Sequence, residues 1–138
     1  MANYEKPLPN PGLDSLVFWG GCKKHQLLIP RCRKCGTYHF FPRFFCTKCL
    51  STDLEWVKSS GRGEVYTFTI IEKAGIGAFA EEVPYILALV QLEENVRMMS
   101  NIIECPLEKI RIGMKVEVVF EDITEEITLP KFRPLVTN

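Results

Sequence analysis

At 138 residues and 46% hydrophobic composition, the chain can form one ordinary core, or a small module beside a domain of about a hundred residues. Its 17 basic and 17 acidic residues cancel, and a net charge of zero argues against a general nucleic-acid binder. The longest apolar run, Ile86 to Val90, is far shorter than the ~20 residues that span a bilayer. The polar N-terminus lacks the apolar segment of a signal peptide, so we expect a soluble cytoplasmic protein without membrane contacts.

Residues 1–26 are predicted to form a proline-bearing arm followed by a short helix. Gly20-Gly21 weakens this helix by about 1 kcal/mol per glycine relative to alanine, which puts its length in doubt. Phe18 and Trp19 lie to the side of its apolar stripe, where they either cover the cysteine-bearing module that follows or anchor on a partner protein. The apolar stripe itself consists of Leu13, Leu16 and Val17.

Residues 27–53 contain two Cys-x-x-Cys pairs, Cys32 with Cys35 and Cys46 with Cys49, and a strand over Leu27 to Ile29 leads into the first. This spacing is a strong signal for a tetrahedral four-thiolate metal site. Zinc is the default ion, and iron is the alternative because four thiolates also suit a rubredoxin-type iron. Four protein ligands leave no position for water or substrate, so we expect a structural ion. A redox dithiol would need a βαβ setting, which the pattern does not indicate.

The loop between the two pairs is unusually aromatic and basic. Five aromatic residues occur between positions 38 and 45, more than a metal module needs as cover, so one or two exposed rings would form a contact surface. His39 is a weaker ligand candidate beside four cysteines. Gly36 suits a tight turn with positive φ after the first pair, whereas Leu50 at the matching place is less suitable. Residues 22–50 carry seven cationic side chains and no acidic one. A zinc ion with four thiolate ligands has a net double negative charge, and these cations partly compensate that charge.

Residues 54–138 are predicted to form a β domain that starts at Leu54 and Trp56. Three strands, a brief helical interruption and two more strands give the order of an OB-fold, a five-stranded barrel. The loop from Lys73 to Pro84 bears glycines and Phe79, as a ligand-gripping loop would, and a mobile surface loop is the alternative. The expected elements are strands over Glu64–Ile71, Tyr85–Leu92, Val96–Ile103, Met114–Asp122 and Ile127–Leu129, and a turn of helix over Leu107–Ile110.

The sequence lacks a recognisable catalytic set. Only His25 and His39 can serve as an imidazole base, and both lie beside the metal module. No nucleophile elbow or dinucleotide fingerprint occurs. Cys22 and Cys105 are possible nucleophiles, but a free cysteine is more often a small buried hydrophobe. We therefore interpret the chain as a binding module that is no enzyme on its own.

Several motifs follow one another between about residues 16 and 135: a Phe-Trp-bearing helix, Arg-Cys-Arg-Lys-Cys-Gly, an aromatic-proline segment ending in Phe-Cys-Thr-Lys-Cys, Leu-Glu-Trp-Val, Gly-Arg-Gly-Glu-Val-Tyr-Thr-Phe-Thr, Arg-Ile-Gly-Met-Lys-Val-Glu-Val-Val-Phe-Glu-Asp and Leu-Pro-Lys-Phe-Arg-Pro. Together they resemble the zinc-ribbon/OB-fold family of acyl-CoA-associated proteins, formerly a domain of unknown function. The departures are Gly20-Gly21 and Leu50. The resemblance implies a mostly β protein: a short N-terminal helix, a rubredoxin-like zinc ribbon and a C-terminal OB-fold barrel.

The resemblance also implies an accessory role beside thiolase-superfamily enzymes or hydratase-type partners. The partner supplies the catalytic cysteine and histidine, while the family member bridges subunits and helps to hold the acyl-CoA. CoA carries phosphates and an adenine, for which cations and an aromatic ring are apt. A nucleic-acid-binding zinc-ribbon/OB-fold protein and a free-standing acyl-CoA enzyme using Cys105 are the alternatives. The candidate acyl-CoA contacts are Arg62, Phe79, Lys131, Phe132 and Arg133. The alternative is a structural role, for Arg62 in a turn and for Lys131, Phe132 and Arg133 in a segment that closes the barrel.

Overall fold

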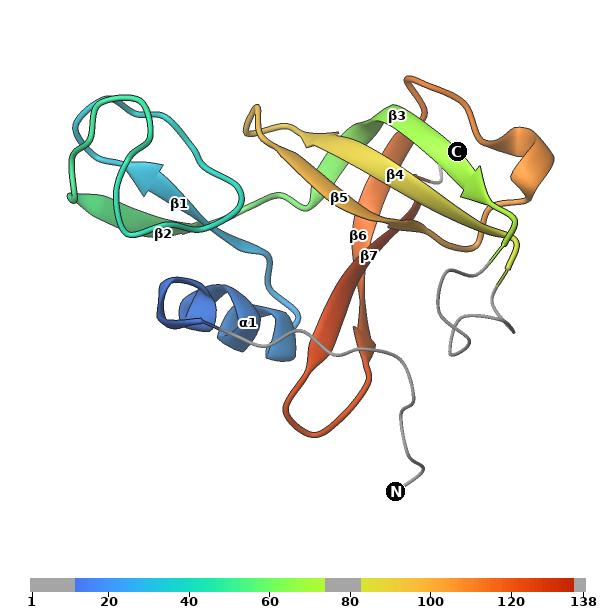
Figure 1. Cartoon of the computed structure of the whole chain (residues 1–138), viewed down its shortest axis with the longest axis horizontal. Coiled ribbons are helices and arrows are strands. Elements are labelled where there is room, and N and C mark those ends of the chain that lie inside the picture. Colours follow the sequence, from blue (N-terminus) through green and yellow to red (C-terminus); the bar gives the residue numbers. More distant parts are fainter. Residues whose placement is uncertain (1–11, 74–82, 136–138) are drawn as a thin grey trace.

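The computed structural model describes residues 12–73 and 83–135, which form a helix, a small ribbon and a barrel (Figure 1). A 3₁₀ turn, η1 (Leu13–Ser15), leads into α1 (Leu16–Lys23). The predicted N-terminal arm and Phe79 lie outside the described residues. Within the described part of the chain, no helix combines the length and apolar character needed to cross a membrane.

Helix α1 continues through Gly20-Gly21 and ends at Lys23, which gives the helix length that the two glycines left open. A Cβ on Gly21 would lie 2.9 Å from the Leu28 side chain, which means that a glycine lets the helix approach the ribbon. The buried face of α1 consists of Phe18, Gly21 and Cys22. The stripe predicted to be its apolar face is instead exposed: Leu13, Leu16 and Val17.

The ribbon is a two-stranded antiparallel sheet of β1 (Leu28–Cys32) and β2 (Leu54–Lys58). Cys32 ends β1, and the other three cysteines of the two pairs lie in the connection between the strands. Strand β2 was expected to open the barrel domain, but its register with β1, from Leu28 opposite Lys58 to Cys32 opposite Leu54, places it in the ribbon. We therefore propose that the boundary between ribbon and barrel falls at residues 59–61.

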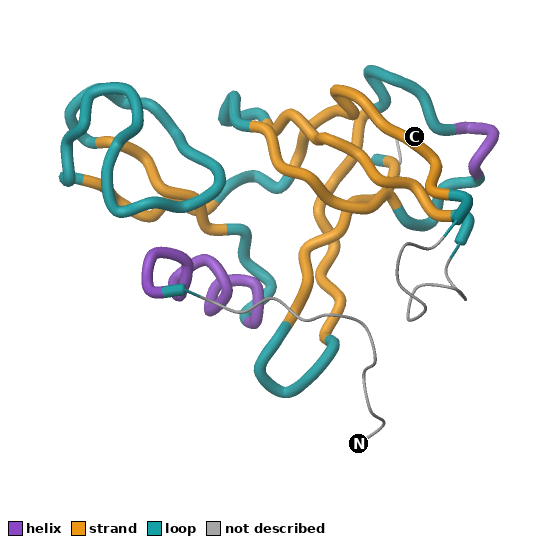
Figure 2. The backbone as a smooth tube through the Cα atoms, viewed as in Figure 1, coloured by secondary structure: helices purple, strands orange, loops and turns teal. Residues whose placement is uncertain are grey.

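The barrel strands are β3 (Arg62–Ile71), β4 (Tyr85–Leu92), β5 (Arg97–Ile102), β6 (Lys115–Asp122) and β7 (Thr128–Pro134). They form a closed barrel in the order β3-β4-β5-β7-β6. Figure 2 draws the strands in orange. All neighbouring strands are antiparallel except β5 and β7, which pair in parallel at Ile102 and Phe132. This order, with the 3₁₀ turn η3 (Leu107–Lys109) between β5 and β6, confirms the predicted OB-fold.

The barrel core follows the alternation of its strands. Along β4, every second residue from Ile86 to Leu92 is buried, as expected for strands with one face toward the interior. Strand β7 is longer than predicted and includes the Pro130-to-Pro134 segment that was expected to follow it. Within this extension, Phe132 is completely buried and packs into the core.

The long β6–β7 hairpin extends from the barrel toward α1 (Figure 1). Its contact with the helical end is anchored by His25, whose Nε2 lies 3.1 Å from both carboxylate oxygens of Asp122. The His25 ring also stacks on Phe120, with ring centroids 5.3 Å apart. Thr128 Oγ1 donates a 2.6 Å hydrogen bond to Asp122. The carboxylate therefore links the two strands of the hairpin to His25, two residues after the end of α1. We call this group the His25–Asp122 clasp.

Candidate metal centre and ligand-binding face

The four cysteine sulfurs gather at the end of the ribbon. All four Sγ atoms lie within 4.8 Å of one another, with Cys32 Sγ 3.6 Å from Cys49 Sγ and Cys35 Sγ 3.5 Å from Cys46 Sγ. An ion bound tetrahedrally by four sulfurs at about 2.3 Å needs sulfur separations of about 3.8 Å. The arrangement therefore fits a four-thiolate metal ion, and every position of its coordination sphere is filled by the protein.

Two matching turns hold the sulfurs. The backbone N–H of Cys35 points at Cys32 Sγ and that of Cys49 at Cys46 Sγ, at 3.5 and 3.4 Å. Each turn ends in a left-handed residue, Gly36 with φ 77° and Leu50 with φ 65°. The second turn thus holds a branched side chain in the conformation that glycine adopts with least strain, as the comparison of the two turns predicted.

Two arginines beside the metal centre are paired with acidic side chains. Arg31 binds Glu55 at 3.3 Å, and Arg33 binds both Asp53 at 2.9 Å and Glu55 at 3.2 Å. Hydrogen bonds with Thr37 lower the pKa of Cys35 to about 6. Two of the predicted cations are therefore engaged in structural ion pairs, which weakens the case for a nucleic-acid surface on this segment.

The remaining candidate nucleophiles and bases are poorly suited to catalysis. Burial raises the pKa of Cys22 to about 12, and burial, followed by Glu108, raises that of Cys105. Burial lowers the pKa of His39, and its Nε2 has no hydrogen-bond partner among the described residues. His25 is half exposed and belongs to the clasp. None of these groups joins a second one in a nucleophile–base pair within the described residues.

The structure brings three of the predicted ligand contacts to the outer face of β3, β6 and β7. Arg62 and Arg133 both stand in register with Glu117, one from each side, and Arg133 Nη2 lies 3.2 Å from its carboxylate. Lys131 lies two residues before Arg133 on the same face, and its Nζ is 3.4 Å from Glu121. Phe132 points the opposite way, into the core, and its ring has no exposed surface for a ligand.

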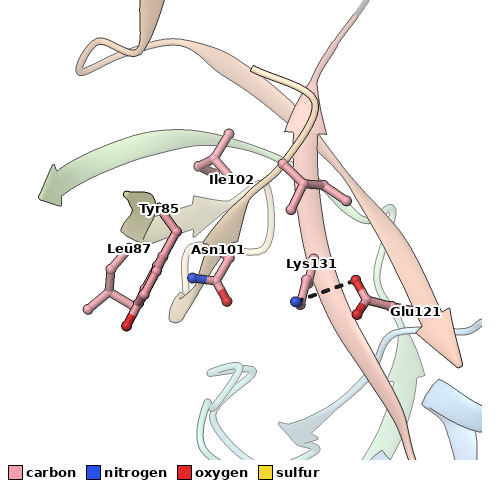
Figure 3. Close-up of a pocket in the computed structure, with 7 residues that line it drawn as sticks. Tyr85, Leu87, Asn101, Ile102, Glu121 and Lys131 are labelled. Carbon is pink, nitrogen blue, oxygen red and sulfur yellow. Dashed lines mark ion pairs between the residues drawn. The ribbon is translucent and has the colours of Figure 1, made fainter. Parts of the chain in front are cut away.

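A pocket of about 480 Å³ opens on the outer face of the barrel beside Lys131. Figure 3 shows Tyr85 and Leu87 on one side of it, Lys131 and Glu121 on the other, and Asn101 between them. The Lys131 side chain is only 12% exposed. OB-folds bind their ligands on this strand face, so the pocket is a candidate ligand site. Its residues come from four separate strands, which is why the sequence alone did not indicate it.

A second, more apolar pocket of about 360 Å³ adjoins the first and shares Asn101 and Lys131 with it. Its walls come from α1, the aromatic loop and the barrel, so it joins all three parts of the molecule. Phe18 packs edge-on against Trp19 and Phe40 within this wall, with centroids 4.9 and 5.5 Å apart. Its lining includes Trp19, Phe40, Phe41, Met98, Met99 and Leu129.

Comparison with known proteins agrees with this architecture. Residues 19–55 match the rubredoxin-like zinc ribbon domain of ChsH2, and residues 56–121 match the C-terminal OB-fold domain of ChsH2. Together the two matches cover most of the chain. The protein therefore belongs to the ChsH2-type zinc-ribbon/OB-fold family, the DUF35 family, as the motif order indicated.

Its relatives include both scaffolds and enzyme subunits. A DUF35 domain-containing scaffold protein of Methanocaldococcus jannaschii is 40% identical over 110 residues, covering 78% of this chain and 77% of that protein. The benzoylsuccinyl-CoA thiolase subunit BbsA of Geobacter metallireducens is 38% identical over 93 residues, covering 67% of this chain and 60% of that subunit. The solved structure of the Ltp2-ChsH2(DUF35) aldolase has a chain that matches with a TM-score of 0.84 and 35% identity, covering 94% of this chain and all of that one.

Proposed function

We propose that this chain is a non-catalytic, zinc-binding scaffold subunit of a thiolase-type or related acyl-CoA-processing complex, in which it bridges subunits and contributes to acyl-CoA binding. The observation that carries the proposal is the closed four-cysteine site in a chain whose other described cysteines and histidines form no catalytic pair. Such a site stabilises a fold and leaves no coordination position for a substrate. The names of the relatives, a scaffold and a thiolase subunit, point to the same role.

The acyl-CoA would bind along the two adjoining pockets. Lys131, which lines both, supplies a largely buried cation for a phosphate or carbonyl oxygen, and Arg62 and Arg133 supply further charge on the same barrel face. The apolar pocket suits the acyl and pantetheine portions. Phe132 is not part of this proposed surface because its ring is buried.

The scaffold role is tested by affinity purification of the tagged chain from its native source, followed by identification of the retained proteins and metal analysis. We expect zinc near one equivalent and a thiolase-superfamily or hydratase subunit in stoichiometric amount. Tight, salt-sensitive retention of RNA or DNA without any acyl-CoA enzyme would overturn the proposal in favour of a nucleic-acid-binding protein.

The acyl-CoA contact is tested by titrating acetyl-CoA into the purified complex by calorimetry. Lys131→Met is expected to weaken binding about tenfold, the effect of losing one charge-assisted hydrogen bond. Lys115→Met is the matched control, since Lys115 forms a comparable ion pair with Glu64 at 2.9 Å on the neighbouring strand. Equal affinities for the two variants would remove Lys131 from the proposed site.

A further inference from the structure

The barrel is closed most weakly between β5 and β7. Within its described part, every other pair of neighbouring strands is joined at three or more positions, whereas β5 and β7 pair at Ile102 and Phe132 alone. Just before this bridge, residues 98–101 of β5 and 129–131 of β7 line the apolar pocket of about 360 Å³. The pocket is therefore a slot between two strand edges, and we call it the β5–β7 seam.

Two backbone groups of β5 point into this seam. The N–H of Leu92 donates to the C=O of Val96 at 2.8 Å, so the backbone of Val96 faces β4. The N–H of Ile103 donates to the C=O of Phe132 at 2.8 Å, so the backbone of Ile103 faces β7. Successive residues of a strand direct their backbone groups to opposite sides, so the odd-numbered residues of β5 face β7. The N–H and C=O of Met99 therefore point into the seam, and no described group of β7 pairs with them.

The sequence of β7 prevents this edge from being paired further. Beyond the bridge between Ile102 and Phe132, a parallel ladder would next join the C=O of Met99 to the N–H of residue 130. Residue 130 is a proline, which has no N–H, and its C=O already accepts a 2.8 Å hydrogen bond from Ser100 Oγ. The backbone of Met99 thus offers both a donor and an acceptor to a ligand that carries the complementary groups.

The other walls of the seam suit the rest of a chain-like ligand. Lys131 and Asn101 lie on opposite sides of the place where the seam meets the larger pocket (Figure 3). The Lys131 side chain is largely buried, so it supplies one cation at this junction. The rings of Phe18, Trp19 and Phe40 supply an apolar wall. The seam therefore combines a strand edge that can bond an amide, an apolar wall and a single cation.

We propose that the β5–β7 seam binds the pantetheine arm of acyl-CoA, and that one amide of this arm takes the place of the missing strand partner of Met99. The inference rests on the proposed acyl-CoA role and names the backbone groups that perform it. Pantetheine is an extended chain whose secondary amides each present an N–H and a C=O, as an added strand does. A peptide of a partner protein carries the same groups, but it would have to continue beyond the seam, and the bridge between Ile102 and Phe132 closes one end.

The test titrates acetyl-CoA into the purified complex by calorimetry and compares two substitutions of the same residue. Met99→Pro removes the N–H that points into the seam, whereas Met99→Ala removes the side chain and keeps this N–H. Proline is compatible with this position because the N–H of Met99 is not part of the ladder with β4. We expect Met99→Pro to bind acetyl-CoA about tenfold more weakly than Met99→Ala, the effect of losing one hydrogen bond.

Equal dissociation constants for the two variants would overturn the assignment of the amide to this strand edge and leave the proposed acyl-CoA role standing. ADP is the matched control ligand, because it shares the adenine, ribose and diphosphate of CoA and lacks the pantetheine arm. It should bind the two variants equally. A tenfold difference with ADP as well would show that proline acts through the barrel as a whole, and would contradict the seam as the cause.

Amide hydrogen exchange of the wild-type complex gives an answer that does not depend on a variant. Added acetyl-CoA should slow exchange at residues 98–101 and leave residues 110–114 unchanged. Protection of 98–101 on assembly of the complex, before acetyl-CoA is added, would show that a partner segment fills the seam and would overturn the pantetheine assignment. A wild-type complex that binds no acetyl-CoA would overturn both this inference and the acyl-CoA part of the proposed function.

Discussion

The barrel and the N-terminal module, residues 13–58, reach a stable fold by different means. The barrel closes five strands around a continuous apolar core in which Val65, Val90, Val116 and Phe132 are essentially inaccessible to solvent. The ribbon has only two strands, which are marginal on their own, and at its far end the place of a core is taken by four sulfurs.

This difference explains where the apolar side chains go. A barrel must turn its hydrophobic residues inward, because their burial is its main source of stability. A module fixed by a metal can leave Leu13, Val17 and Phe44 exposed and still fold. The comparison indicates that a bound ion can hold a fold together while apolar side chains stay at the surface, where the scaffold role that we propose would use them.

The largest expected effect comes from removing a buried metal ligand. Cys46→Ser should abolish metal binding and unfold the ribbon, because the binding free energy of such sites, on the order of 10 kcal/mol, is also folding free energy. In an amide NMR spectrum, resonances of residues 28–58 should lose their dispersion while those of 62–71 and 85–134 keep it. Unfolding of the barrel at the same time would show that the two regions are not independent.

A cavity in the barrel should destabilise the barrel and leave the metal site intact. Phe132→Ala removes a completely buried ring and is expected to cost about 3–5 kcal/mol of unfolding free energy, measured by urea denaturation of the metal-loaded chain. Metal content should be unchanged. If this variant instead kept wild-type stability and lost acyl-CoA binding, Phe132 would be a ligand contact after all.

The two metal turns differ by one residue and therefore provide a smaller, internal comparison. Leu50→Gly relieves a branched side chain at φ 65° and should stabilise the ribbon by about 1 kcal/mol, whereas Gly36→Ala at φ 77° should destabilise it by a similar amount. The midpoint of ribbon unfolding in urea, followed at fixed zinc concentration, measures both. A loss of stability in Leu50→Gly would indicate that the Leu50 side chain makes a stabilising contact.

The smallest effect concerns the His25–Asp122 clasp that joins the regions. Hydrogen bonds from Thr128, and then from His25, lower the pKa of Asp122 below its usual 3.8. A lowered carboxylate pKa stabilises the fold above the unfolded value, and this contribution disappears as the pH falls through the folded value. The melting temperature of wild type should therefore slightly exceed that of Asp122→Asn at pH 7, and the difference should start to shrink as the pH falls below 3.8, with the metal content of both proteins checked at each pH. A constant difference across this range would contradict the assignment.

Much of this arrangement follows from local patterns. The Cys-x-x-Cys spacing predicted the four cysteines whose sulfurs the fold brings together, and alternation located the barrel strands to within a few residues. Strand β7 was underestimated because Pro130 and Pro134 resemble a terminating signal, although proline is compatible with strand positions where no ladder N–H is needed.

Helix α1 buries a different face from the one that its most hydrophobic residues suggest, and close packing is the reason. Hydrophobicity alone would place Leu13, Leu16 and Val17 on the buried face of the helix. Close packing instead favours a face on which a large ring lies beside small residues. Phe18 with Gly21 and Cys22, at i+3 and i+4, was the available signal. The pocket around Lys131 left no such signal, because Tyr85, Asn101 and Glu121 become neighbours only after the barrel has closed.

The most direct test of the central claim is a turnover assay with acyl-CoA that compares the zinc-loaded chain alone, its enzyme partner alone and the reconstituted complex. We expect no turnover by the chain alone under any condition, and turnover by the complex that is lost when the partner's nucleophile is substituted. Turnover of a CoA ester by the isolated chain would contradict the account.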